Sequence, residues 1–118
     1  MEFLKKNALK FYKKAEESYE EGDYNFTMFF VEQTIQLILK YLISKKYGDF
    51  PKSHGLKLLF ELTGDKKLME FRERNLDILR DIELSYVASR YFDVEYSQET
   101  ARRALEAVKK LMEVCGID

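Results

Sequence analysis

The sequence has few of the residues that build covalent or metal-bound frameworks. Its 118 residues include one Cys, one His, one Pro, five Gly and no Trp. A single cysteine, Cys115, excludes an internal disulfide and a cysteine-based zinc site. The single histidine, His54, excludes the inward-facing Glu-x-x-His pairs of di-iron helical bundles, and the isolated glycines exclude a phosphate-binding loop. We therefore expect neither a metal nor another cofactor.

The sequence also lacks an excess of charge of either sign. Lys and Arg number 20 and Asp and Glu number 21, which gives a net charge of -1. This balance argues against broad electrostatic binding of nucleic acid or membrane. No uninterrupted apolar run reaches the roughly 18 residues of a membrane span, and the charged N-terminus does not resemble a signal peptide. We expect a cytoplasmic protein, and the Lys- and Glu-rich composition would suit a thermophile.

What the sequence does have is helical periodicity. Hydrophobic residues make up 46% and charged residues 35%, which is typical of a soluble globular chain, and the length fits one domain, residues 1–118. Residues 24–47 contain no Gly or Pro and place apolar side chains over more than half of a helical wheel. This segment is therefore predicted to be a long central helix that neighbours enclose on two or three sides.

Stop and cap residues divide the remaining chain into further helices. The predicted helices cover residues 2–21, 24–47, 53–62, 66–91 and 97–115. The two-residue link Gly22-Asp23 predicts antiparallel packing of the first two helices, with Asp23 as a cap, and Ser53 and Ser97 can cap later ones. Because no segment alternates like a strand, the sequence predicts an all-α, up-and-down bundle of four long helices and one short helix.

Two features could form a binding site. A narrow polar strip on the central helix contains Glu32, Gln33, Gln36 and Lys40, and it is either a solvated edge or a site. Arg90, at the end of the fourth helix and followed by Tyr91, either neutralises the last carbonyls of that helix or binds an anion through its planar fork of donors. In an antiparallel bundle, the strip and Arg90 could border the same cleft.

The single histidine is not expected to act in catalysis. His54 has no nucleophile nearby in sequence, so we expect it to pack at the start of the short helix and to hydrogen-bond the backbone. The buried stripes of the helices hold no carboxylates in this interpretation, which again argues against a metal site.

Four segments together resemble a known family. They are AEESYEEGDY at residues 15–24, FVEQTIQLILKYL at 30–42, SHGL at 53–56 followed by Leu59, and ASRY at 88–91. In order and spacing, the chain resembles small prokaryotic HEPN-domain proteins over nearly its whole length. The resemblance implies a five-helix bundle and a homodimer, in which apolar side chains near Tyr86 and Arg90 meet their symmetry mates. Many such domains are encoded beside, or act with, minimal nucleotidyltransferases.

The resemblance also implies which residues form a site. The family's second helix typically has Gln, Glu and Lys where this chain has Gln33, Gln36 and Lys40. Some HEPN proteins are metal-independent ribonucleases with Arg followed, after four to six residues, by His. Here no His follows Arg90, and Tyr96, which lies within that window, is a poor base because its ordinary pKa is near 10.

These departures favour a non-catalytic HEPN module. It is expected to dimerise and to bind a nucleotide, a phosphate ligand or a partner nucleotidyltransferase at Arg90, Tyr91, Gln33, Gln36 and Lys40. One alternative is a degenerate ribonuclease of a toxin–antitoxin pair that cleaves RNA with Arg90 and Tyr96. The other is a protein-interaction scaffold whose polar strip binds no small molecule.

Overall fold

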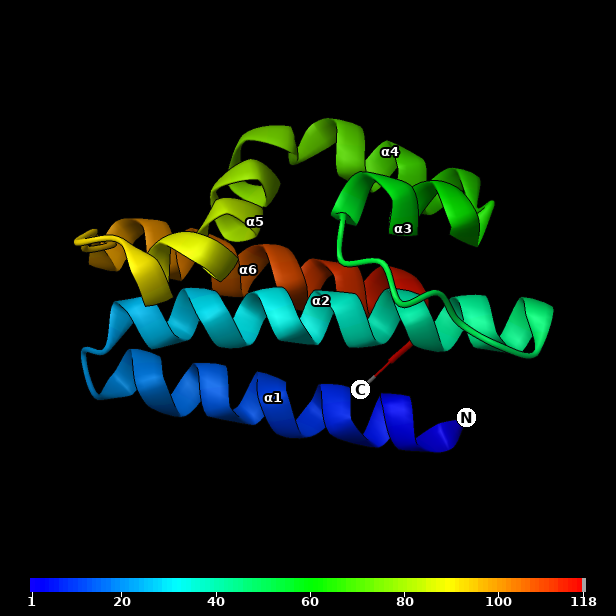
Figure 1. Cartoon of the computed structure of the whole chain (residues 1–118), viewed down its shortest axis with the longest axis horizontal. Helices are drawn as coiled ribbons and strands as arrows, with labels where there is room; N and C mark the ends of the chain where they lie inside the picture. Colours follow the sequence, from blue (N-terminus) through cyan, green and yellow to red (C-terminus); the bar gives the residue numbers. More distant parts are fainter. Residues whose placement is uncertain (118) are drawn as a thin grey trace.

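The computed structural model describes residues 1–117, which form six helices and, over that range, no strand. The helices are α1 (Glu2–Glu20), α2 (Tyr24–Tyr47), α3 (Leu56–Thr63), α4 (Lys66–Arg74), α5 (Leu76–Tyr91) and α6 (Gln98–Cys115). They pack as an all-α bundle (Figure 1), which is the predicted fold class.

Helix α2 lies at the centre of this bundle. Helix α1 runs antiparallel along one side of it, α6 packs along another, and α3 and α5 cover a third (Figure 1). Its fully enclosed side chains include Met28, Val31, Ile35, Ile38 and Leu39. By length and composition α2 could cross a membrane, but 67% of its apolar window is buried inside the bundle. This burial is typical of the core helix of a helical bundle.

The turn between α1 and α2 uses the glycine that the sequence marks. Gly22 has φ 77°, in the left-handed region that favours glycine. The predicted side-chain cap by Asp23 is wrong, because its carboxylate makes no cap hydrogen bond. Instead the hydroxyl of Thr27 donates to the Asp23 carbonyl at 3.1 Å and lies 2.9 Å from the buried Ser18 hydroxyl. This contact joins the two helices at their connected ends.

The predicted single helix over residues 66–91 is interrupted in its middle. Asn75, with φ -124° and ψ 25°, separates α4 from α5, and its side-chain amide donates to the Phe71 carbonyl at 2.8 Å. The side chain therefore takes over one of the backbone acceptors that the end of α4 leaves open. The break lets α4 pack beside α3 while α5 crosses α2.

The short helix α3 begins later than predicted. It starts at Leu56 after Gly55, and Ser53 does not cap it. The Leu56 amide instead donates to a carboxylate oxygen of Glu83 in α5 at 3.0 Å. The predicted cap at Ser97 is confirmed, since its hydroxyl accepts from the Thr100 amide at the start of α6. Asp65 caps α4 in the same way, because its carboxylate accepts from the Lys67 and Leu68 amides.

Candidate functional site

The polar strip of α2 is buried, and its glutamines bond to its carboxylate. Glu32 is only 1% exposed. The amide of Gln33 donates to one of its oxygens at 2.7 Å, and the amide of Gln36 donates to the other. Burial raises the pKa of Glu32, the two amides lower it, and the nearby carboxylate of Glu83 raises it again, so that the pKa lies above its ordinary value. We call Glu32, Gln33, Gln36 and Lys40 the polar seam.

Lys40 closes the other end of the seam. Its side chain is largely buried, and burial lowers its pKa, while the charge of Glu32 acts in the opposite direction. No ion pair joins the two groups in the part of the chain that the structure describes. Carboxylates were predicted to be absent from the buried stripes, and Glu32 shows that this is wrong.

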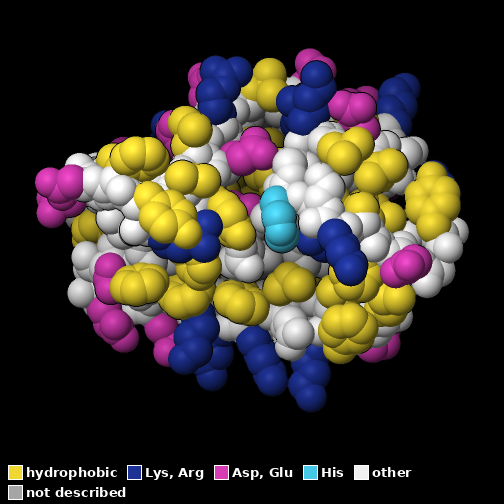
Figure 2. All heavy atoms as spheres, in the orientation of Figure 1, with side chains coloured by type: hydrophobic (Ala, Val, Ile, Leu, Met, Phe, Trp, Pro, Cys, Tyr) yellow, Lys and Arg dark blue, Asp and Glu magenta, His cyan; other side chains and the backbone are white. Residues whose placement is uncertain are grey.

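His54 extends the seam to the molecular surface. Its Nδ1 lies 3.0 Å from the side-chain oxygen of Gln36, so it bonds a side chain and not the backbone as predicted. Its ring stacks on Tyr86 of α5, with 5.8 Å between ring centres and 22° between the planes. The imidazole is exposed on the face that Figure 2 presents. Gln36 and His54 thus connect the buried carboxylate to α5.

Arg90 lies on the far side of this connection. Its Nε donates to the Tyr86 carbonyl at 2.9 Å, and its guanidinium carbon lies 4.3 Å from the centre of the Tyr86 ring. This carbonyl lies in the turn before the last carbonyls of α5, which are the partners that the sequence predicts for Arg90. The two terminal amino groups of the guanidinium have no hydrogen-bond or ion-pair partner among the described residues. They remain free to bind an anion.

A hollow of about 350 Å³ lies beside Arg90, where the start of α2 meets the end of α5. We call it the Arg90 hollow, and it is lined by Asp23, Asn25, Phe26, Phe29, Ser89 and Arg90. The Ser89 hydroxyl is buried and has no hydrogen-bond partner among the described residues. A buried hydroxyl without a partner is uncommon and is costly to maintain unless something binds it.

A match to a protein-family model over almost the whole chain decides the family. The family model for the HEPN domain matches residues 1–117. The chain belongs to the HEPN-domain family. No curated protein and no solved structure matches it significantly. The order of the four sequence segments therefore identified the family correctly, and the fourth predicted helix of this HEPN domain is divided at Asn75.

The predicted site residues of this HEPN domain fall into two groups. Gln36 is linked to Arg90 only through His54 and Tyr86. Gln33 bonds to Glu32 instead, and Lys40 lies further along α2. The side-chain amides of Gln33 and Gln36 thus already donate to Glu32 and are not free for a ligand. The Arg90 hollow is lined by other side chains.

The end of α5 and the loop after it contain the remaining predicted residues. Tyr91 is mostly exposed and lies beside the guanidinium of Arg90, 5.2 Å from ring centre to carbon. Tyr96 is half-buried, and burial together with the charge of Asp81 raises its pKa above the ordinary value. A raised pKa leaves even less of the phenolate form of Tyr96 at neutral pH, so the side chain is a poorer general base there than the sequence indicates.

Sequence reasoning missed the side chains that shape the hollow. Asn25 holds the loop after α5 in place: its amide donates to the Val94 carbonyl at 2.7 Å, and its oxygen accepts from the Tyr96 amide at 2.9 Å. Phe29 stacks at 6.4 Å from Tyr86. These residues lie far apart in sequence from their partners, so no local pattern indicates the contacts. The polar Asn25 at the start of an apolar helix is the one available signal.

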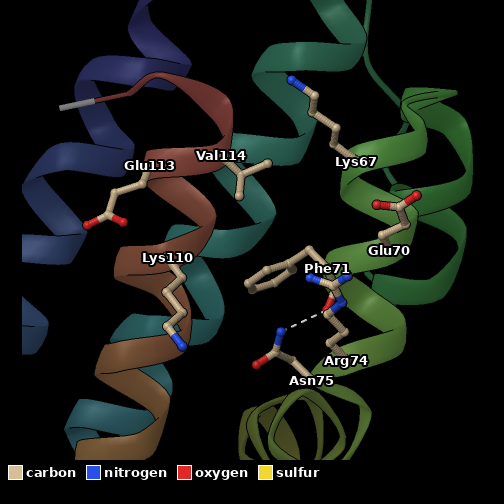
Figure 3. Close-up of a pocket in the computed structure, with 8 residues that line it drawn as sticks. All are labelled: Lys67, Glu70, Phe71, Arg74, Asn75, Lys110, Glu113 and Val114. Atoms are coloured by element: carbon tan, nitrogen blue, oxygen red, sulfur yellow. Dashed lines mark hydrogen bonds between the residues drawn. The ribbon is translucent and has the colours of Figure 1, made fainter.

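A second hollow, of about 720 Å³, lies between α4 and α6 (Figure 3). Each of its two walls carries charges of both signs: Lys67, Glu70 and Arg74 come from α4, and Lys110 and Glu113 come from α6. The hollow is remote from the predicted site residues, so the Arg90 hollow remains the candidate functional site.

Proposed function

We propose that this HEPN domain is a non-catalytic binding module that takes a nucleotide or a related phosphorylated ligand in the Arg90 hollow. The observation that supports this most directly is a guanidinium with two free amino groups beside a buried hydroxyl that lacks a partner. Arginine offers paired donors that match phosphate oxygens. A phosphate in the hollow would pair with the terminal amino groups of Arg90, and the buried Ser89 hydroxyl would become its partner only on turning into the hollow.

The walls of the hollow suit the remainder of a nucleotide. Phe26 is exposed and Phe29 half-buried, so both present ring surface from α2. Bases stack on such rings with little dependence on sequence. The volume of about 350 Å³ falls at the lower end of ordinary small-molecule sites, which begin at roughly 300 Å³. A single nucleotide is therefore a better fit than a long polymer.

A homodimer is the second part of the proposal. Leu84, Val87 and Tyr91 follow one another at helical spacing on α5 and are exposed by 60%, 44% and 71%. An apolar stripe that contacts its own copy across a two-fold axis needs no complementary surface elsewhere. Because Arg90 lies next to Tyr91, such a pair would bring two Arg90 hollows close together. A partner nucleotidyltransferase on the same stripe is the alternative occupant.

Titration calorimetry with adenosine monophosphate tests the ligand. We expect the wild-type protein to bind and Arg90→Ala to lose at least 10-fold in affinity, because a bidentate, charge-assisted contact is removed. Arg80→Ala, which removes another exposed cation of α5, is the matched control and should leave binding unchanged. Equal binding by wild type and Arg90→Ala would refute the site.

The ribonuclease alternative has weaker support. It needs Tyr96 as the partner of Arg90, yet the pKa of Tyr96 is raised and its side chain is half-buried. We therefore expect no Arg90-dependent cleavage of single-stranded RNA between pH 6 and 9, followed by gel electrophoresis. Cleavage that disappears in both Arg90→Ala and Tyr96→Phe would favour the enzyme over the binding module.

A further inference from the structure

The hydrogen bonds of the polar seam determine which ring nitrogen of the neutral His54 imidazole carries the proton. Both oxygens of Glu32 accept from glutamine amides, and the Gln36 amide points its NH₂ group at the carboxylate. The reverse orientation would set the Gln36 oxygen against a carboxylate oxygen, which is repulsive. The oxygen of Gln36 therefore faces His54. An oxygen acceptor at 3.0 Å requires that Nδ1 of the imidazole carry the proton.

Once Nδ1 carries the proton, Nε2 of the neutral ring is a hydrogen-bond acceptor. The ring is exposed, and its orientation is held by the hydrogen bond to Gln36 on one side and by the stack on Tyr86 on the other. Glu32 is thus a positioning residue that acts through Gln36. A buried carboxylate with two amide partners is an expensive arrangement for a solvated edge, and it gives His54 one defined tautomer.

His54 and Arg90 share Tyr86 as a platform. The imidazole lies 5.8 Å and the guanidinium carbon 4.3 Å from the same ring centre, so the two groups are within about 10 Å of each other. Phe29, which lines the Arg90 hollow, also stacks near Tyr86. The guanidinium is a donor only, and the imidazole Nε2 is an acceptor. Together they would recognise an anionic acceptor and a hydroxyl donor on one ligand.

We propose that His54 is a specificity-determining residue of the same site and that the ligand is a ribonucleotide, with its phosphate at Arg90 and a ribose hydroxyl donating to Nε2 of His54. This inference rests on the proposed nucleotide binding and extends it, since it names a residue and a ligand class that phosphate recognition alone does not require. The polar seam is then the support of His54 and not itself a binding surface.

Calorimetry with adenosine monophosphate, its 2′-deoxy form and its 3′-deoxy form tests the inference. We expect the wild type to bind the ribonucleotide roughly 3- to 10-fold more tightly than at least one deoxy form, which is the scale of one neutral hydrogen bond. His54→Phe keeps an aromatic ring on Tyr86 but has no acceptor, so it should bind all three equally. His54→Gln can still offer an oxygen and should restore part of the preference.

The outcomes separate the two proposals. If none of the three nucleotides binds to the wild type, nucleotide binding is refuted and the role of His54 with it. If all three bind the wild type equally, or if His54→Phe keeps the preference, the role of His54 alone is refuted.

The tautomer is tested without any ligand. Because the chain has a single histidine, its ring nitrogens give one unambiguous set of ¹⁵N NMR signals. At a pH where the imidazole is neutral, we expect the proton on Nδ1 in the wild type. In Gln36→Leu the mixture of tautomers seen for a solvated imidazole should return. Finding the proton on Nε2 in the wild type would overturn the inference.

Discussion

At the scale of single residues, the main finding is that a polar strip on a helical wheel does not have to face water. On the wheel of α2 the seam residues occupy the one hydrophilic sector, which indicates a solvated edge or an open site. In the bundle, the segment before α3 and the crossing helix α5 cover this sector, through the contacts of His54 with Gln36 and Tyr86. Those contacts join residues 18 or more positions apart, and a wheel contains no information about them.

Glu32 gives a testable pH dependence. Burial holds its pKa above the ordinary value of 4.5, so the folded chain keeps this proton at pH values where the unfolded chain has lost it. The free energy of unfolding therefore falls as pH rises from about 4.5 through the folded pKa. Glu32→Gln cannot ionise, so we expect its stability relative to wild type to improve across this window. Urea unfolding at a series of pH values measures the difference.

The control for this experiment is Glu20→Gln, which changes an exposed carboxylate at the end of α1. Its unfolding curve should follow that of the wild type at each pH. Parallel pH profiles for wild type and Glu32→Gln would mean that the buried carboxyl has the same proton affinity in the folded and unfolded chains.

At the scale of secondary-structure elements, the boundaries that the sequence predicts well are those set by local chemistry. Helix α2 begins and ends at the predicted residues because it lacks breakers and because Gly48, at φ 84°, supplies a left-handed cap. The break at Asn75 was missed because an asparagine in a helical pattern is not a reliable stop. What makes it one here is its side-chain bond to Phe71 and the different packing partners of α4 and α5.

The loop between α5 and α6 depends on a single side chain of another element. Asn25 provides two hydrogen bonds to it, so we expect Asn25→Ala to cost roughly 1–3 kcal/mol in unfolding free energy. Amide hydrogen exchange at Tyr96 should accelerate as the loop loosens. Asn25→Asp keeps the acceptor for the Tyr96 amide but loses the donor to Val94, so exchange at Tyr96 should be slower in this variant than in Asn25→Ala. Unchanged exchange in both variants would show that the loop is held by other contacts.

At the scale of the whole molecule, the order of motifs in the chain predicted the family, while the composition predicted only a soluble globular chain. The HEPN match over residues 1–117 includes the segments at the first turn, the central helix, the short helix and the end of α5. The site was less accessible to this reasoning. Arg90 could be identified from its chemistry, but Phe29 and His54 come near it only because α2, α5 and the segment before α3 meet in space.

The dimer is the last prediction and concerns the surface of α5. We expect the wild type to sediment as a dimer at micromolar concentration, because Leu84, Val87 and Tyr91 form an exposed apolar stripe that a second copy can cover. Leu84→Glu should give a monomer, since two carboxylates would meet near the two-fold axis without water or a partner. Leu58→Glu, at an apolar residue of α3 that is 46% exposed, is the matched control and should remain dimeric. A wild-type monomer at this concentration would refute the symmetric pair and leave the stripe to a different protein.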